Sequence, residues 1–127
     1  MTLDRIVNAL GAAFFVLCAA VQINDPDPVR WITVYGVSAT LCASAAIRRT
    51  VPLTVTLVWG LLTGAVGLGL LAFWQGPSHP MPGFPTWRPF NEEVVREAMG
   101  LGICSLWALS LTVWEWRRTA VASTSSR

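Results

Sequence analysis

Residues 52–74 read PLTVTLVWGLLTGAVGLGLLAFW, a stretch that contains no charged side chain. As a helix it would measure about 34 Å, which is enough to cross a hydrocarbon core of about 30 Å. Residues 6–23, 31–47 and 97–116 form further stretches of similar length that are mostly apolar. Backbone polar groups in lipid need partners within their own segment, and alternation with period two is absent, which favours helices over a membrane barrel. We therefore predict an all-α membrane protein, a bundle of four transmembrane helices.

The composition agrees with a lipid environment. Of the 127 residues, 54% are hydrophobic and 13% are charged; the charged share is about half that of a soluble domain. The net charge of +2 is small and dispersed, which argues against a nucleic-acid partner. The three cysteines lie inside apolar stretches at spacings that fit no metal or redox motif, so we interpret them as packing residues.

The stretches define one domain. We expect helices at about residues 5–24, 28–48, 52–75 and 92–117, within a single transmembrane domain, 1–116, that is followed by a flexible cytoplasmic tail, 117–127. The stretch 31–47 is the shortest and is rich in Ser, Thr and Ala. It can span the membrane if its small polar face packs inward. We expect the stretch 6–23 to be retained as a helix, since it is long for the core of a signal peptide.

Charged residues between the stretches set the orientation. With four crossings, one side of the membrane carries mainly basic residues, namely Arg5, Arg48, Arg49, Arg117, Arg118 and Arg127 against Asp4 and Glu115. The other side is mainly acidic, with Asp25, Asp27, Glu92, Glu93 and Glu97 against Arg30, Arg88 and Arg96. The positive-inside rule then places both termini in the cytoplasm. All basic residues are Arg, as in GC-rich genomes, and we expect the inner membrane of a bacterium.

Side chains three and four residues apart share a helix face. This spacing predicts one such face on each of the four helices. In chain order the faces are Asn8, Ala12, Phe15, Ala19 and Gln22; Arg30, Thr33, Val37, Thr40 and Ser44; Gly60, Gly64 and Gly67; and Glu93, Glu97, Gly100, Cys104 and Ala108. We expect these faces to point into the bundle. The glycine face permits close helix packing, either within the chain or against a partner.

The acids of the outer side are predicted to meet at the mouth of the bundle. The predicted cluster consists of Asn24, Asp25, Asp27, Arg30, Glu93 and Glu97. Asp25 before Pro26 ends the first helix, and Asp27 can cap the second, which then begins at Pro28. The simplest interpretation is a structural network of turn, cap and Arg–carboxylate pairs.

A metal ion is the alternative use of this cluster. Carboxylates such as Asp25, Asp27, Glu93 and Glu97 suit a divalent hard cation, and with His79 they could hold zinc or manganese. His79 is the only histidine and lies in a Pro-rich loop, where it is most simply an exposed side chain. Beyond this possible cation we expect no cofactor. No nucleophile–base pair is apparent, so we assign no catalytic residue.

Three segments resemble the transmembrane protein 220 family. They are VQINDPD (residues 21–27), RWITVYG (30–36) and EEVVREAMGL (92–101), and the resemblance covers about residues 5–116. The sequence is identified as a bacterial member of that family. The resemblance implies a small multi-helix integral membrane protein and implies no particular reaction.

Three functional hypotheses follow. The first is a non-enzymatic accessory or interaction subunit, which contacts lipid and joins a larger complex or a second copy through its small-residue faces. The second is a binding or transport protein that uses Asp25, Asp27, Glu93 and Glu97 for a cation or cationic ligand. The third is a membrane hydrolase built on the same acids and His79.

Overall fold

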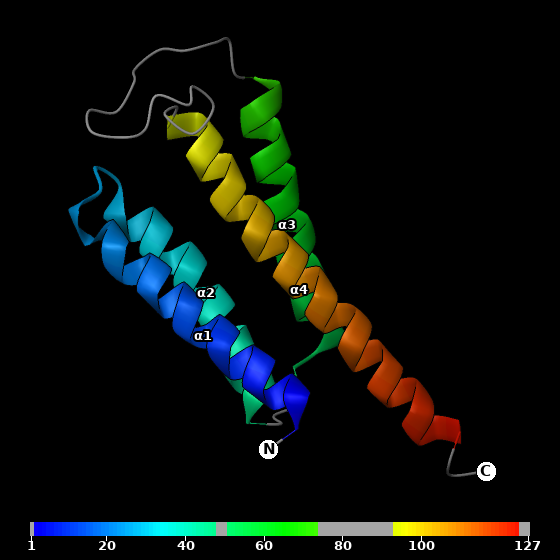
Figure 1. Ribbon diagram of the computed structural model, residues 1–127. Helices are drawn as coiled ribbons and strands as arrows, with labels where there is room; N and C mark the ends of the chain where they lie inside the picture. Colours follow the sequence, from blue (N-terminus) through cyan, green and yellow to red (C-terminus); the bar gives the residue numbers. More distant parts are fainter. Residues whose placement is uncertain (1, 48–50, 74–92, 125–127) are drawn as a thin grey trace.

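The computed structural model describes residues 2–47, 51–73 and 93–124. Within these ranges the chain forms four α-helices and a short 3-10 helix (Figure 1): α1 (Leu3–Val21), η1 (Gln22–Asn24), α2 (Pro28–Ala46), α3 (Leu53–Ala72) and α4 (Glu93–Thr124). The described ranges contain no strand. The predicted all-α class is therefore confirmed. His79 and the Pro-rich loop around it lie outside the described residues.

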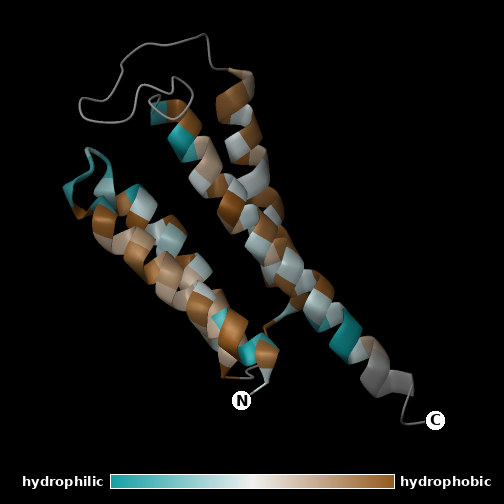
Figure 2. Cartoon of the chain, viewed as in Figure 1, coloured by the Kyte–Doolittle hydropathy of each residue, from teal (hydrophilic) through white to brown (hydrophobic). Residues whose placement is uncertain are grey.

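Three of the described segments are long and apolar enough to cross a membrane: Leu3–Asn24, Leu53–Ala72 and Glu93–Ala120. Figure 2 shows hydrophobic colour along most of the length of these helices. Leu10, Leu68 and Leu106 face outward and are 66%, 70% and 70% exposed. Large apolar side chains exposed to this extent along whole helices fit contact with lipid rather than water.

The helices form two antiparallel hairpins. Helix α1 packs along α2, and α3 packs along α4. The contact between the hairpins is chiefly between α2 and α4. The four helices are thus arranged as two closely packed helix pairs, and the contact between the two pairs is less extensive.

Helix α4 is longer than the sequence indicates. It continues beyond residue 117 to Thr124, into the segment that we expected to be a tail. Residues 117–124 contain neither Gly nor Pro, so nothing in them breaks a helix. Arg118 also pairs with Glu115 at 3.1 Å, one turn apart, which supports the helix at this end.

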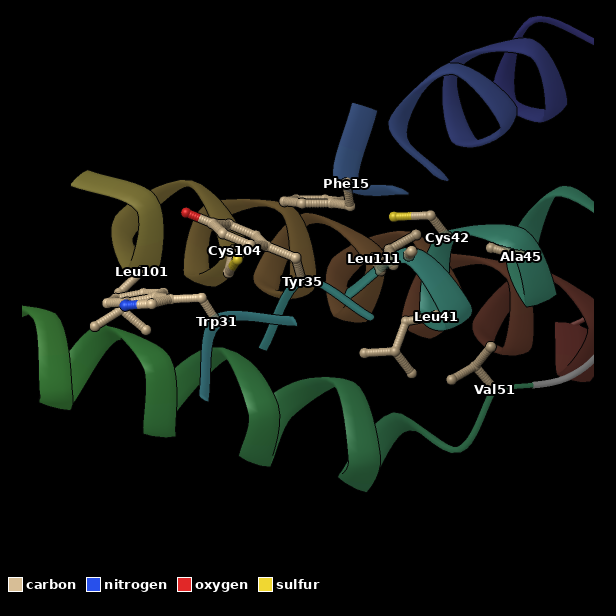
Figure 3. Close-up of a cluster of buried hydrophobic side chains, with 11 residues drawn as sticks. Phe15, Trp31, Tyr35, Leu41, Cys42, Ala45, Val51, Leu101, Cys104 and Leu111 are labelled. Atoms are coloured by element: carbon tan, nitrogen blue, oxygen red, sulfur yellow. The ribbon is translucent and has the colours of Figure 1, made fainter. Parts of the chain in front are cut away.

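Aromatic rings join the two hairpins at the core. Figure 3 shows Phe15 and Tyr35 of the first hairpin beside Cys104 of α4. Phe15 of α1 is fully buried. Its ring centroid lies 6.4 Å from that of Tyr35 in α2 and 6.0 Å, edge to face, from that of Trp107 in α4. Such aromatic pairs contribute about 0.5–1.5 kcal/mol beyond the area that they bury. The predicted inward face of α1, with Asn8 and Phe15, is confirmed as buried.

Hydrogen bonds between helices add specific attachments. The Arg5 Nε–H donates to the Ala46 carbonyl at 2.9 Å and so ties the start of α1 to the end of α2. The Trp59 indole N–H of α3 donates to the Ser38 hydroxyl of α2 at 3.1 Å. Since Trp59 and Ser38 belong to different hairpins, this bond helps to fix the register between them.

The buried face of α2 differs from the face that the sequence indicates. It consists of Trp31, Tyr35, Ser38, Ala39, Leu41, Cys42 and Ala45. The predicted face contains Arg30, Thr33 and Thr40, which are exposed, so that prediction is wrong. The Thr33 and Thr40 hydroxyls donate to the carbonyls of Val29 and Gly36, at 2.7 and 2.8 Å, and therefore need no inward partner. The aromatic rings of Trp31 and Tyr35 gain more free energy from packing between helices than the small Thr side chains would.

The predicted glycine face of α3 is used inside the chain. A Cβ added at Gly60 would lie 2.8 Å from Leu109 Cγ, and one at Gly67 would lie 3.3 Å from the Ala98 carbonyl oxygen, both in α4. The Ser105 hydroxyl donates to the Gly60 carbonyl at 2.7 Å across this contact. The missing side chains thus let α3 and α4 approach closely enough for a hydrogen bond to a backbone carbonyl.

We predict that Gly60→Leu destabilises the protein, whereas Gly69→Leu does not. Gly69 lies on the same helix with no atom within 4 Å of an added Cβ, so the two variants gain the same helix propensity and differ in packing. Overpacking at Gly60 should cost about 1–3 kcal/mol. Thermal unfolding in a mild detergent measures the difference. Equal midpoints for both variants would show that the α3–α4 contact is absent.

Candidate functional site

The outer turn between α1 and α2 carries the NDPDP segment. Asp25 has extended backbone angles, φ −73° and ψ 150°, as its position before Pro26 requires. Its carboxylate Oδ1 accepts a hydrogen bond from the Asp27 N–H at 3.0 Å, which closes the turn. Helix α2 begins at Pro28, as predicted.

Asp27 plays a different part from the one expected. It stands at the N-cap position of α2, but its side chain makes no cap hydrogen bond. Its carboxylate instead pairs with Arg30, with Oδ2 and Nη2 3.2 Å apart. The two side chains are 61% and 63% exposed, so this pair contributes at most about 1 kcal/mol.

A small polar cleft lies beside this turn, between the outer ends of α2 and α4. Its volume is about 80 Å³, and its lining residues are Gln22, Asp25, Trp31, Tyr35, Glu93, Arg96 and Glu97. Of the predicted cluster, Asp25, Glu93 and Glu97 come together here. Asp27 and Asn24 are exposed and do not line the cleft. We refer to this site as the outer cleft.

Glu97 is a half-buried carboxylate of the cleft. It lies near the like charges of Glu93 and Asp25, and Arg30 is close enough to offset them in part. The Trp31 indole is its polar neighbour. The positive charge of Arg30 therefore attracts the Glu97 carboxylate, although the ion pair that Arg30 makes is with Asp27.

The aromatic wall of the cleft was missed from the sequence. Trp31 and Tyr35 lie one turn apart on α2, with ring centroids 6.0 Å from each other. The Tyr35 hydroxyl comes so close to Gly100 of α4 that a side chain there would collide with it. The spacing of four residues between Trp31 and Tyr35 was the available signal, and it places both rings on one helix face.

The cleft suits binding better than nucleophilic chemistry. Its three carboxylates, an amide and aromatic rings attract a small cationic group, and the Arg96 guanidinium reduces that attraction. Among residues 2–47, 51–73 and 93–124, no three His, Cys, Asp or Glu side chains are arranged to hold a metal ion. His79, the remaining metal candidate, lies outside these ranges.

Comparisons with known proteins agree with the resemblance seen in the sequence. The family model described as Transmembrane family 220, helix, matches residues 14–113, which include all three quoted motifs. The chain is 35% identical to Transmembrane protein 220 of Xenopus laevis, over a region that covers 83% of this chain and 56% of that protein. The chain thus spans about half the length of this relative. No solved structure matches the present chain.

Proposed function

Because the chain belongs to the transmembrane protein 220 family, we propose that it is a non-enzymatic integral membrane protein with four crossings and both termini in the cytoplasm. Its length-matched helices and the charge asymmetry of its ends support this topology. We propose that the membrane is the inner membrane of a bacterium and that the outer cleft opens to the periplasm, because the basic residues lie mainly at the opposite end of the helices.

Helix α2 is the crossing that needs a separate argument, since it is less apolar than the other three. It packs antiparallel along α1, so it shares whatever layer α1 occupies. Its 19 residues span about 28 Å, close to the hydrocarbon thickness. Ser38, Thr33 and Thr40 each donate to a carbonyl four residues back, which satisfies their hydroxyls without water.

The proposed function is the binding of a small cationic group at the outer cleft. The observation that carries it is the arrangement of three carboxylates, Asp25, Glu93 and Glu97, beside the rings of Trp31 and Tyr35. Carboxylates supply charge, and aromatic faces attract cations by about 0.5–2 kcal/mol, the higher value applying when water is excluded. The volume of about 80 Å³ limits the ligand to a small ion such as a primary ammonium group.

A second proposal is an accessory role in a larger membrane assembly. The observation that favours it is the set of glycines with open space in front of them: Gly36, Gly69 and Gly102 have no atom within 4 Å of an added Cβ. Such positions allow another helix to approach closely. Gly60, Gly64 and Gly67 are already used between α3 and α4, so a partner would have to use the open glycines.

The topology predicts opposite labelling of two positions. Asp27→Cys should react with a membrane-impermeant maleimide on intact cells, whereas Arg117→Cys should react only after permeabilisation. Both side chains are exposed. The native chain is the background control, because Cys18, Cys42 and Cys104 lie within the helices. Three crossings separate these positions in the proposed topology, so labelling of both from the same side would contradict it.

The cleft predicts that binding of methylammonium depends on Glu97 but not on Asp27. Glu97→Gln should weaken the affinity about tenfold, since it removes an enclosed charge worth about 1.4 kcal/mol. Asp27→Asn is the matched control, because Asp27 is a carboxylate of the same turn that faces away from the cleft. Calorimetric titration in detergent measures the dissociation constant of methylammonium for each variant. No binding by the native chain would refute the proposal, and preferential binding of calcium or magnesium would replace it with a divalent-cation site.

The accessory role predicts association in mild detergent. Light scattering should give a mass above that of one chain, and Gly102→Leu should reduce it, because a side chain there blocks close approach. Gly102 meets nothing within the chain, so the variant should keep its thermal midpoint. A monomer at every concentration, without co-purifying partners, would contradict this role.

A further inference from the structure

An apolar groove runs between α1 and α4 at the end of the protein opposite the outer cleft. Its volume is about 600 Å³, within the range of roughly 300–1,000 Å³ that small-molecule sites occupy. The lining residues are Leu3, Asp4, Val7, Asn8, Ile103, Leu106, Trp107, Ser110, Leu111 and Trp114. We call it the inner groove.

The length of the groove matches one leaflet of a bilayer. From Ile103 to Trp114 the α4 wall rises by about 16 Å, about half of a hydrocarbon core of about 30 Å. Trp114 lies at the terminal end of the groove, and aromatic side chains such as this one gather at membrane interfaces. The groove therefore reaches from the interface to about the middle of the membrane.

The terminal end of the groove carries both signs of charge. Asp4 of α1 is one of its lining residues. On α4, the Arg118 guanidinium lies 4.9 Å from the centroid of the Trp114 ring, one turn beyond the groove wall. Its Nη1 pairs with Glu115, and its other N–H groups can donate to a phosphate. A cation and an anion at the membrane interface, above an apolar channel, complement a head group that contains both an amine and a phosphate.

The groove wall does not suit a helix as occupant. Helices that associate in membranes use small residues to approach closely. Here the wall consists mainly of Leu, Ile, Val and Trp side chains, whereas Gly60, Gly64 and Gly67 are buried against α4 elsewhere. A flexible acyl chain, in contrast, can follow an irregular apolar wall.

We infer that the inner groove binds one phospholipid with a zwitterionic amine head group, its acyl chain between α1 and α4 and its head group between Asp4 and Arg118. This site is independent of the outer cleft and of the ligand proposed there. It also differs from general lipid contact, because it holds one molecule in one place.

The test measures retained phosphatidylethanolamine by native mass spectrometry after the full chain is purified from vesicles of phosphatidylethanolamine and phosphatidylglycerol. Leu106 lines the groove and Leu68 of α3 does not, yet both are 70% exposed. Leu106→Trp should lower retention about tenfold, since the loss of two methylenes from the groove is enough for that effect. Leu68→Trp should leave it unchanged. Equal retention in the two variants overturns the proposal.

The head-group assignment has its own variants. Asp4→Asn should remove the preference for phosphatidylethanolamine over phosphatidylglycerol, and Arg118→Gln should weaken retention of both. Arg117→Gln, at an exposed neighbouring position, is the control and should change neither. A native preference for phosphatidylglycerol, or a lipid-free dimer that Leu106→Trp dissociates, would overturn the assignment.

A photoactivatable acyl chain gives a readout that does not depend on any variant. With phosphatidylethanolamine labelled in this way, the native chain should be cross-linked mainly within residues 103–114. Cross-links spread evenly over the exposed faces of α3 and α4 would show that lipid contact is unspecific and would overturn the proposal.

Discussion

A polar group in hydrocarbon must find its partner within the protein, and this constraint shapes every level of the structure. In α2 it is met locally, because Thr33 and Thr40 bond to carbonyls of the preceding turn. Between helices it is met by few but well-placed bonds, such as the Ser105 hydroxyl to the Gly60 carbonyl. Once these groups are satisfied, the helix sides can be apolar, and the remaining charges collect at the two ends.

Much of this arrangement could be predicted from the sequence. Apolar stretches give the helices, three short motifs give the family, and the X-Pro steps of the NDPDP segment give the turn. The inward glycine face of α3 was also predicted. These features depend on local periodicity or on the fixed backbone of proline, which a sequence displays directly.

Features that depend on competition between contacts could not be predicted. Helical spacing alone cannot decide whether Thr33 or Trp31 faces inward, because a Thr hydroxyl is satisfied either by a neighbouring helix or by its own backbone. Likewise, Arg30 had several possible carboxylate partners, and the nearest in sequence, Asp27, took its ion pair. The cleft therefore contains aromatic rings where the sequence indicated more charge.

The outer cleft and the inner groove are linked through aromatic residues of the core. The Trp107 indole occupies the space beside Gly11, where any side chain would collide with it, and its ring meets Phe15 edge to face. Trp107 also lines the inner groove, and the missing side chain at Gly11 lets α1 lie against this ring. Phe15 in turn stacks on Tyr35, which forms part of the cleft wall. A chain of aromatic contacts thus runs from the wall of the groove to the wall of the cleft.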